Sequence, residues 1–170
     1  MAKSTASSGT PQIATADEMA LAPPERVPPE AQRRWGKDMM EARFTIVPNV
    51  LLERMYALGL DSTDLVVLLH LVKHWWTKEN LPHPGISSIA KMMNLHRRTV
   101  QRRLQKLTKQ LKLVTAHPRR SRYGDNETNI YSFEGLIAEA TKLAKEMVQE
   151  REGRRLDDAK RAGRGRRRAS

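Results

Sequence analysis

One stretch limits the fold of this chain more than any other: residues 86–107, with the sequence ISSIAKMMNLHRRTVQRRLQKL. Apolar residues recur at helical spacing on both sides of Asn94, a residue type that tolerates the left-handed backbone conformation in which helices end. The hydroxyl of Ser87 can cap the first helix, and a second helix is expected to begin near His96. The stretch therefore predicts two helices joined by a tight turn.

The second helix, residues 96–110, has an apolar side and a basic side. Val100, Leu104 and Leu107, followed by Leu111, repeat at helical spacing and predict the side that faces a core. The other side and its edges carry the candidate nucleic-acid-binding residues of this helix: Arg97, Arg98, Thr99, Gln101, Arg102, Gln105, Lys106 and Lys109. A solvated helix face normally mixes charges of both signs, but no acidic residue stands between 79 and 125. This one-sided charge favours a polyanionic partner over a merely solvated face.

The spacing of three residues matches a known DNA-binding element. Ala90 is small enough for the second helix to cross close to it, Asn94 is the turn residue four positions later, and Val100 packs the two helices together. The stretch resembles the helix-turn-helix motif, in which Gly is usual at the position of Asn94. The resemblance implies that the second helix enters the major groove of DNA, where Arg suits guanine and Gln suits adenine. Ser87 and Ser88, at the start of the first helix, are expected to contact phosphate.

A β-hairpin is expected directly after this element. Residues 112–116 and 128–133 are β-prone, and a polar, turn-forming loop lies between them. The segment 112–133 resembles the wing of winged helix-turn-helix domains, which lies along the DNA backbone beside the recognition helix. The basic residues of its loop favour contact with DNA over a plain structural hairpin: Arg119, Arg120 and Arg122.

The residues before the motif complete a predicted domain from 35 to 133. We expect three elements in this part: a short strand at 44–47, a helix at 49–58, and a longer, more deeply buried helix at 62–78 that Asp61 or Ser62 caps. The whole resembles the winged helix-turn-helix domains of bacterial transcription regulators and of plasmid and phage replication initiators. The resemblance implies a mainly α fold with a small β-hairpin wing.

A helix is expected at 134–152, and its apolar stripe needs a partner. The stripe consists of Leu136, Ala140, Leu143 and Met147. It can pack on its own domain or pair with the same helix of a second copy. A homodimer through this helix is favoured, because a two-fold protein reads a palindromic site best.

Both ends of the chain are expected to be disordered. Residues 1–34 are rich in Pro, Ser and Ala, and they cannot bury enough apolar surface to offset the entropy lost on ordering. The C-terminal tail, 153–170, is strongly basic: residues 151–170 hold nine basic and three acidic residues, which gives half of the net charge of +12. We expect this tail to attract phosphate without sequence preference.

Composition argues against catalysis. The chain has no cysteine, and no carboxylate joins His70 and His74, which stand one helical turn apart. Neither a Gly-rich phosphate loop nor a nucleophile elbow is present, so we expect no enzyme, no metal, no cofactor and no small-molecule substrate. No apolar run approaches the roughly 20 residues of a membrane helix, and no secretory signal is evident. These features lead us to expect a cytoplasmic, nucleoid-associated protein that does not bind membranes.

The sequence thus predicts a sequence-specific binder of double-stranded DNA that acts as a plasmid or phage replication initiator or as a transcription regulator. Two alternatives stay open. One is a nonspecific DNA- or RNA-binding protein of the nucleoid type, which would bind any duplex equally. The other is a DNA-bound adaptor that recruits a partner through helix 134–152.

Overall fold

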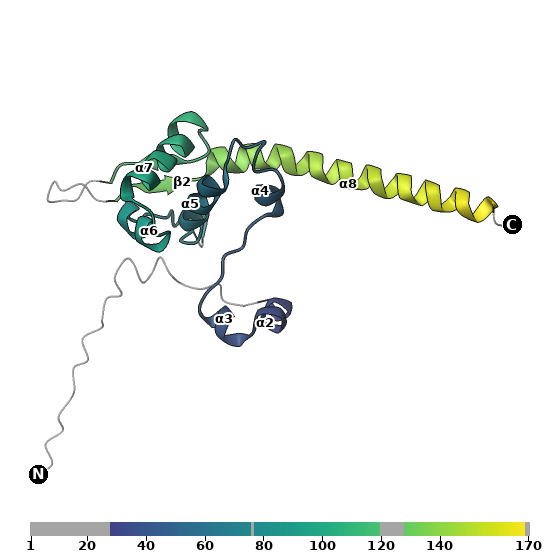
Figure 1. Ribbon diagram of the computed structural model, residues 1–170, viewed down its shortest axis with the longest axis horizontal. Coiled ribbons are helices and arrows are strands. Elements are labelled where there is room, and N and C mark those ends of the chain that lie inside the picture. Colours follow the sequence, from purple (N-terminus) through teal and green to yellow (C-terminus); the bar gives the residue numbers. More distant parts are fainter. Residues whose placement is uncertain (1–27, 76, 120–127, 169–170) are drawn as a thin grey trace, which may run out of the picture.

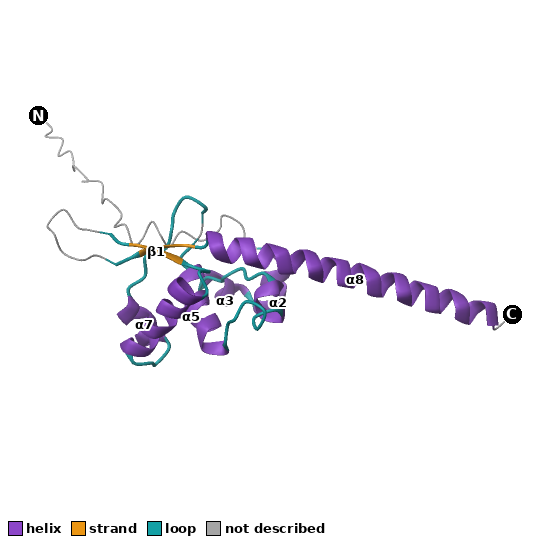
Figure 2. Ribbon diagram, turned by 90° about the horizontal axis from the view of Figure 1, so that it is seen from above, coloured by secondary structure: helices purple, strands orange, loops and turns teal. Residues whose placement is uncertain are grey.

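The computed structural model describes the backbone of residues 28–75, 77–119 and 128–168, and the side chains as far as residue 161. This part of the chain is mainly helical, with a two-stranded antiparallel sheet and one long helix that projects from the domain (Figures 1 and 2). The elements are α2 (Pro29–Trp35), α3 (Lys37–Glu41), α4 (Asn49–Glu53), α5 (Ser62–Val72), α6 (Ile86–Met92), α7 (Arg97–Gln105), the π-helical continuation η1 (Lys106–Gln110), β1 (Thr115–His117), β2 (Ile130–Ser132) and α8 (Glu134–Arg168). The predicted mainly α fold with a hairpin is therefore confirmed.

One hydrophobic core is shared by the four helices α4, α5, α6 and α7, by the sheet and by the first part of α8. Its most deeply buried members include Leu68 and Leu71 of α5, Ile89 of α6, Val100 of α7 and Phe133. Burial of each such side chain stabilises the fold by about 1.5–3 kcal/mol. The predicted apolar side of the second helix is confirmed. Val100, Leu104 and Leu107 are buried, and Leu111 is half-buried against the same core.

The turn between α6 and α7 has the predicted geometry. Asn94 adopts a left-handed conformation with φ of 50°, and the Leu95 N–H donates to the Ala90 carbonyl at 2.9 Å. The predicted cap of the first helix is wrong: the N-cap is Gly85, without a side-chain hydrogen bond, so Ser87 already lies inside the first turn. His96 caps α7 instead of the usual hydroxyl residue, since its Nδ1 accepts from the Arg98 N–H at 3.1 Å.

Three predictions for the residues before the motif differ from the structure. The helix expected at 49–58 is shorter, because α4 ends at Glu53. Helix α5 ends at Val72 rather than near 78, because the chain turns there and Trp75 packs on Phe133 with ring centroids 4.9 Å apart. Trp76 lies outside the described residues. The strand expected at 44–47 is also wrong: these residues form a connection outside any strand. The loop before α6 lies along the edge of β2 that does not pair with β1. There the Tyr131 N–H donates to the Pro82 carbonyl at 2.8 Å.

The N-terminal arm is not disordered throughout. Residues 29–35 form α2, so the prediction for 1–34 is wrong over this part, while residues 1–27 lie outside the described residues. Pro29 occupies the first helical position, where its fixed φ favours a helix, and Arg33 pairs with Glu30 one turn away at 2.6 Å. Figure 1 shows α2 and α3 set apart from the core and joined to α4 by an extended connection.

Helix α8 begins at Glu134 as predicted but does not end near 152. It continues to Arg168, so the prediction of a disordered tail from 153 is wrong over these residues. The tail is rich in Arg and also contains Ala, which are both good helix formers, and these outweigh its glycines. Ion pairs one turn apart, such as Arg154–Glu150 at 3.9 Å, add small increments along the exposed surface.

The apolar stripe of α8 packs on its own domain, which was one of the two predicted partners. Leu136 and Met147 are buried in the common core. Two ion pairs hold α8 beside α4: Arg54–Glu150 at 2.5 Å and Arg151–Glu53 at 3.2 Å. Because this stripe is covered within the chain, a homodimer through α8 would need a different face of the helix.

The packing of α8 depends on a glycine at its second position. A Cβ on Gly135 would lie 2.1 Å from the Lys112 carbonyl oxygen, in a backbone segment that cannot rotate away as a side chain would. We expect Gly135→Ala to lower the free energy of unfolding by roughly 3 kcal/mol, as measured by urea denaturation. Gly153→Ala is the matched control, since nothing lies within 4 Å of its added Cβ. It should instead raise the helical content seen by circular dichroism. Equal loss of stability in both variants would contradict this account.

Candidate nucleic-acid interface

Helix α7 brings most of the predicted nucleic-acid-binding residues together on one solvent-facing side. The exposed members are Arg97, Arg98, Gln101, Arg102 and Gln105, and Lys109 follows on η1. Thr99 and Lys106 are half-buried at the edge of this side. The arrangement follows from the burial of Val100 and Leu104, which turns the polar residues between them outward.

The start of α6 and the base of the hairpin lie beside this helix. Ser87 and Ser88 are exposed in the first turn of α6. A hollow of about 280 Å³ is lined by residues from all three segments, among them Ser87, Arg97 and Asn129. Figure 1 shows α6, α7 and the hairpin at the same end of the molecule, opposite to the free end of α8. The predicted phosphate-contacting serines therefore border the predicted base-contacting helix.

The hairpin after α7 is formed as predicted, although its strands are shorter. Strands β1 and β2 are antiparallel, with Ala116 opposite Tyr131, and the His117 and Ser132 side chains are hydrogen-bonded across them at 3.1 Å. Arg119 is exposed at the end of the described part of the hairpin. Arg120 and Arg122 lie outside the described residues, so their predicted contact with DNA stays a prediction.

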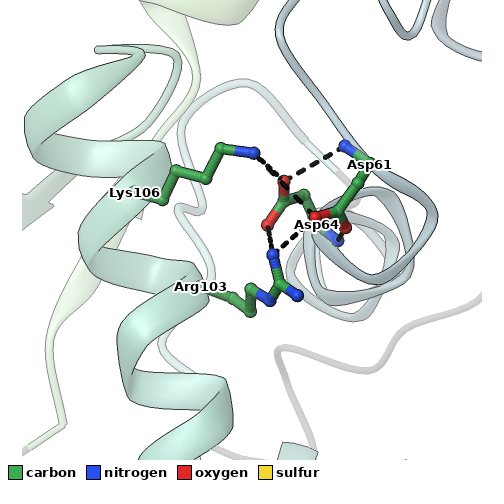
Figure 3. A network of polar contacts seen from close by, with 4 residues as sticks. All are labelled: Asp61, Asp64, Arg103 and Lys106. Atoms are coloured by element: carbon green, nitrogen blue, oxygen red, sulfur yellow. Dashed lines mark hydrogen bonds and ion pairs between the residues drawn. The ribbon is translucent and has the colours of Figure 1, made fainter.

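Four charged residues fix α7 on the start of α5 (Figure 3). The Asp64 carboxylate is fully buried, and it pairs with Lys106 and, at 3.3 Å, with Arg103. Arg103 also donates to Asp61 at 2.5 Å. Asp61 and Asp64 form a capping box, in which each carboxylate accepts from the backbone N–H of the other residue. The network therefore joins the cap of one helix to the side of another.

The network also lowers the pKa of Asp61. Burial raises the pKa of the Asp61 carboxyl, but the Asp64 N–H and the Arg103 guanidinium outweigh this effect and hold that pKa below its ordinary value. Asp61 is therefore ionised at neutral pH, and its carboxylate is the anion that pairs with Arg103. Lys106, predicted to bind DNA, pairs its ammonium with Asp64, and its side chain lines a surface hollow together with Arg102.

Sequence reasoning missed Asp64 and the role of Arg103. A signal was present in the acidic residues three positions apart at the start of α5, which match the spacing of a capping box. Nothing local indicates that their cationic partners come from about 40 residues further along the chain. A pairing over that distance depends on the fold rather than on spacing.

Among the described residues, no group of three or more His, Asp or Glu side chains is placed to hold a metal ion. No described helix has both the length and the apolar character needed to span a bilayer.

The buried carboxylate yields a stability prediction. We expect Asp64→Asn to lower the free energy of unfolding by about 2–3 kcal/mol, because it removes charged hydrogen bonds to Arg103 and Lys106. Urea denaturation measures this change. Glu139→Gln is the control, since it removes the exposed pair with Lys142, and it should cost less than about 0.5 kcal/mol. A similar small effect in both variants would show that the network does not hold α7 in place.

Comparison with known proteins places the chain in a family. The sequence profile of the DnaD N-terminal domain matches residues 47–152, more than half of the chain, from just before α4 to the part of α8 that packs on the domain. Comparison with curated proteins gives no match. Among solved structures, one titled "Possible transcriptional regulator from Methanosarcina mazei Go1" is 21% identical, with a TM-score of 0.38 over 60% of this chain and 81% of that one. A likeness of this size supports no conclusion about fold or function. On the match over residues 47–152, the chain belongs to the DnaD N-terminal domain family.

Proposed function

We propose that this protein binds double-stranded DNA, with α7 in the major groove and the β1–β2 hairpin as a wing along the backbone. The observation that carries the proposal is the exposed side of α7, which is free of acidic residues and lies beside the hairpin and the start of α6. Membership of the DnaD N-terminal domain family supports a DNA-related role in replication or regulation.

The contacts fall into two groups by chemistry. Arg98, Gln101 and Arg102 have side chains of the types that read base edges, and they are exposed on consecutive turns of α7. Ser87, Ser88 and Arg97 lie at the starts of α6 and α7, where they suit the phosphate backbone. Base contacts would give sequence preference, and phosphate contacts would fix the position of the helix.

The basic end of α8 adds a third surface. Arg151, Arg154 and Arg155 are exposed, and the helix points away from the end of the molecule that carries α7 (Figure 1). These charges would attract the phosphates of any duplex and would not read sequence. We therefore assign affinity to the end of α8 and sequence preference to α7.

Selection from a random duplex library at about 150 mM salt tests the proposal, because that salt suppresses purely electrostatic binding. The full chain should enrich a sequence motif. Uniform retention of all sequences would instead favour the nonspecific alternative, and a motif without two-fold symmetry would argue against a homodimer on DNA.

One substitution tests the role of α7 in this selection. Arg102→Ala should weaken binding to the enriched motif by about 1–3 kcal/mol and relax the preference at one position, because the guanidinium that binds a base edge is missing. Arg34→Ala removes the same exposed side chain from α2 and serves as the control. Fluorescence anisotropy with matched and mutated sites measures both variants. A uniform fall in affinity across all sites would move Arg102 to the phosphate-contacting group.

Removal of residues 153–170 tests the role of the end of α8. The shortened chain keeps the pairs that hold α8 beside α4, so we expect the domain to stay folded. Its affinity should fall by a similar factor for every duplex. The slope of log K against log salt should become less steep by about 0.9 for each phosphate that these residues neutralise in the full chain. A change in the enriched motif would contradict the division between affinity and preference.

A further inference from the structure

We propose that Asp61 is a specificity-determining residue, which lowers the affinity of the DNA-binding surface for nonspecific DNA by holding Arg103 away from phosphate. The inference rests on the proposed DNA binding by α7. It concerns a residue on α5, outside the surface described above, whose carboxylate reaches across to the edge of α7.

The cation that Asp61 holds is accessible rather than buried. The Arg103 side chain is 32% exposed and that of Asp61 is 44% exposed, whereas that of Asp64 has no exposure. Arg103 also lines a hollow of about 340 Å³ on the surface of α7 and η1. The hollow is shared with Arg102 on the predicted DNA face and with Lys106, whose ammonium is paired with the buried Asp64. A phosphate that approaches this hollow would meet Arg103 directly.

A DNA phosphate and the Asp61 carboxylate are competing partners for one guanidinium. Both are anions that accept hydrogen bonds from its N–H groups, and Arg103 already donates to Asp61 at 2.5 Å. To bind phosphate with this group, the protein would have to break that pair and leave the Asp61 charge close to the DNA. Asp61 therefore both occupies the cation and repels the competing ligand.

Such competition changes nonspecific binding more than specific binding. Phosphate contacts carry no sequence information, so each one adds similar affinity for every duplex. The exposed base-reading candidates Arg98, Gln101 and Arg102 are not ion-paired in the network with Asp61. Holding Arg103 thus lowers the affinity for random DNA and raises the ratio of specific to nonspecific binding.

Asp61→Asn separates this role from helix capping. Asn is as good an N-cap residue as Asp, so the hydrogen bond from the Asp64 N–H is retained while the charge is removed. In the full chain, binding of a random-sequence duplex should become more salt-dependent, with the slope of log K against log salt steeper by about 0.9. The gain in affinity over the wild type should therefore shrink about threefold between roughly 50 and 200 mM salt, and discrimination against random DNA should fall.

Two further variants make the result decisive. Asp38→Asn removes the same charge from α3 and should leave the slope unchanged, which controls for net charge. In an Arg103→Gln background, Asp61→Asn should no longer steepen the slope, because the released cation is missing. The inference is overturned if Asp61→Asn has no effect on the slope, if Asp38→Asn has the same effect, or if the effect survives in the Arg103→Gln background. If instead the wild type fails to bind duplex DNA at all, the proposed function itself is wrong.

Discussion

The buried carboxylate of Asp64 is the constraint on which the geometry of the proposed DNA-binding surface depends. A charge without access to water is stable only when it is paired and hydrogen-bonded, and both cationic partners of Asp64 come from one side of α7 and η1. Their positions fix the rotation of α7 about its axis. With that rotation fixed, Val100 faces the core and Arg98 and Arg102 face solvent. A polar contact at one edge of the helix thus supports the placement of the neighbouring, exposed side.

Features set by near neighbours in the chain could be predicted from the sequence. The left-handed turn at Asn94, the start of α8 at Glu134 and the apolar side of α7 each depend on residues within one or two helical turns. Most of the candidate interface belongs to this class, because the exposed residues of a helix follow once its apolar side is known. The cap by His96 could not be predicted from residue type alone, since imidazole is an uncommon cap and works here through its Nδ1.

Features set by distant partners could not be predicted. Helix α5 stops early because Trp75 meets Phe133, and Lys106, predicted from its position on the helix to bind DNA, also pairs with the buried Asp64. The apolar stripe containing Leu136 and Met147 would have the same sequence pattern whether it packed on its own domain or on a second copy of the chain. Only the fold shows that it packs on its own domain. The helical structure of the basic end of the chain also could not be predicted from its sequence. Its composition fits disorder, yet a helix that is already anchored by packing extends without a new nucleation cost.

The continuity of α8 changes how its charges can act. A disordered tail would fold back to any nearby phosphate, including those next to α7. Beyond Arg151, which pairs with Glu53, the helix instead continues to Arg168, about 25 Å at 1.5 Å per residue. It points away from the end of the molecule where α7 and the hairpin lie (Figure 1). Under the proposed function, cations along this helix would therefore meet phosphates remote from the bases that α7 would read, so they would add affinity without competing for the same stretch of backbone.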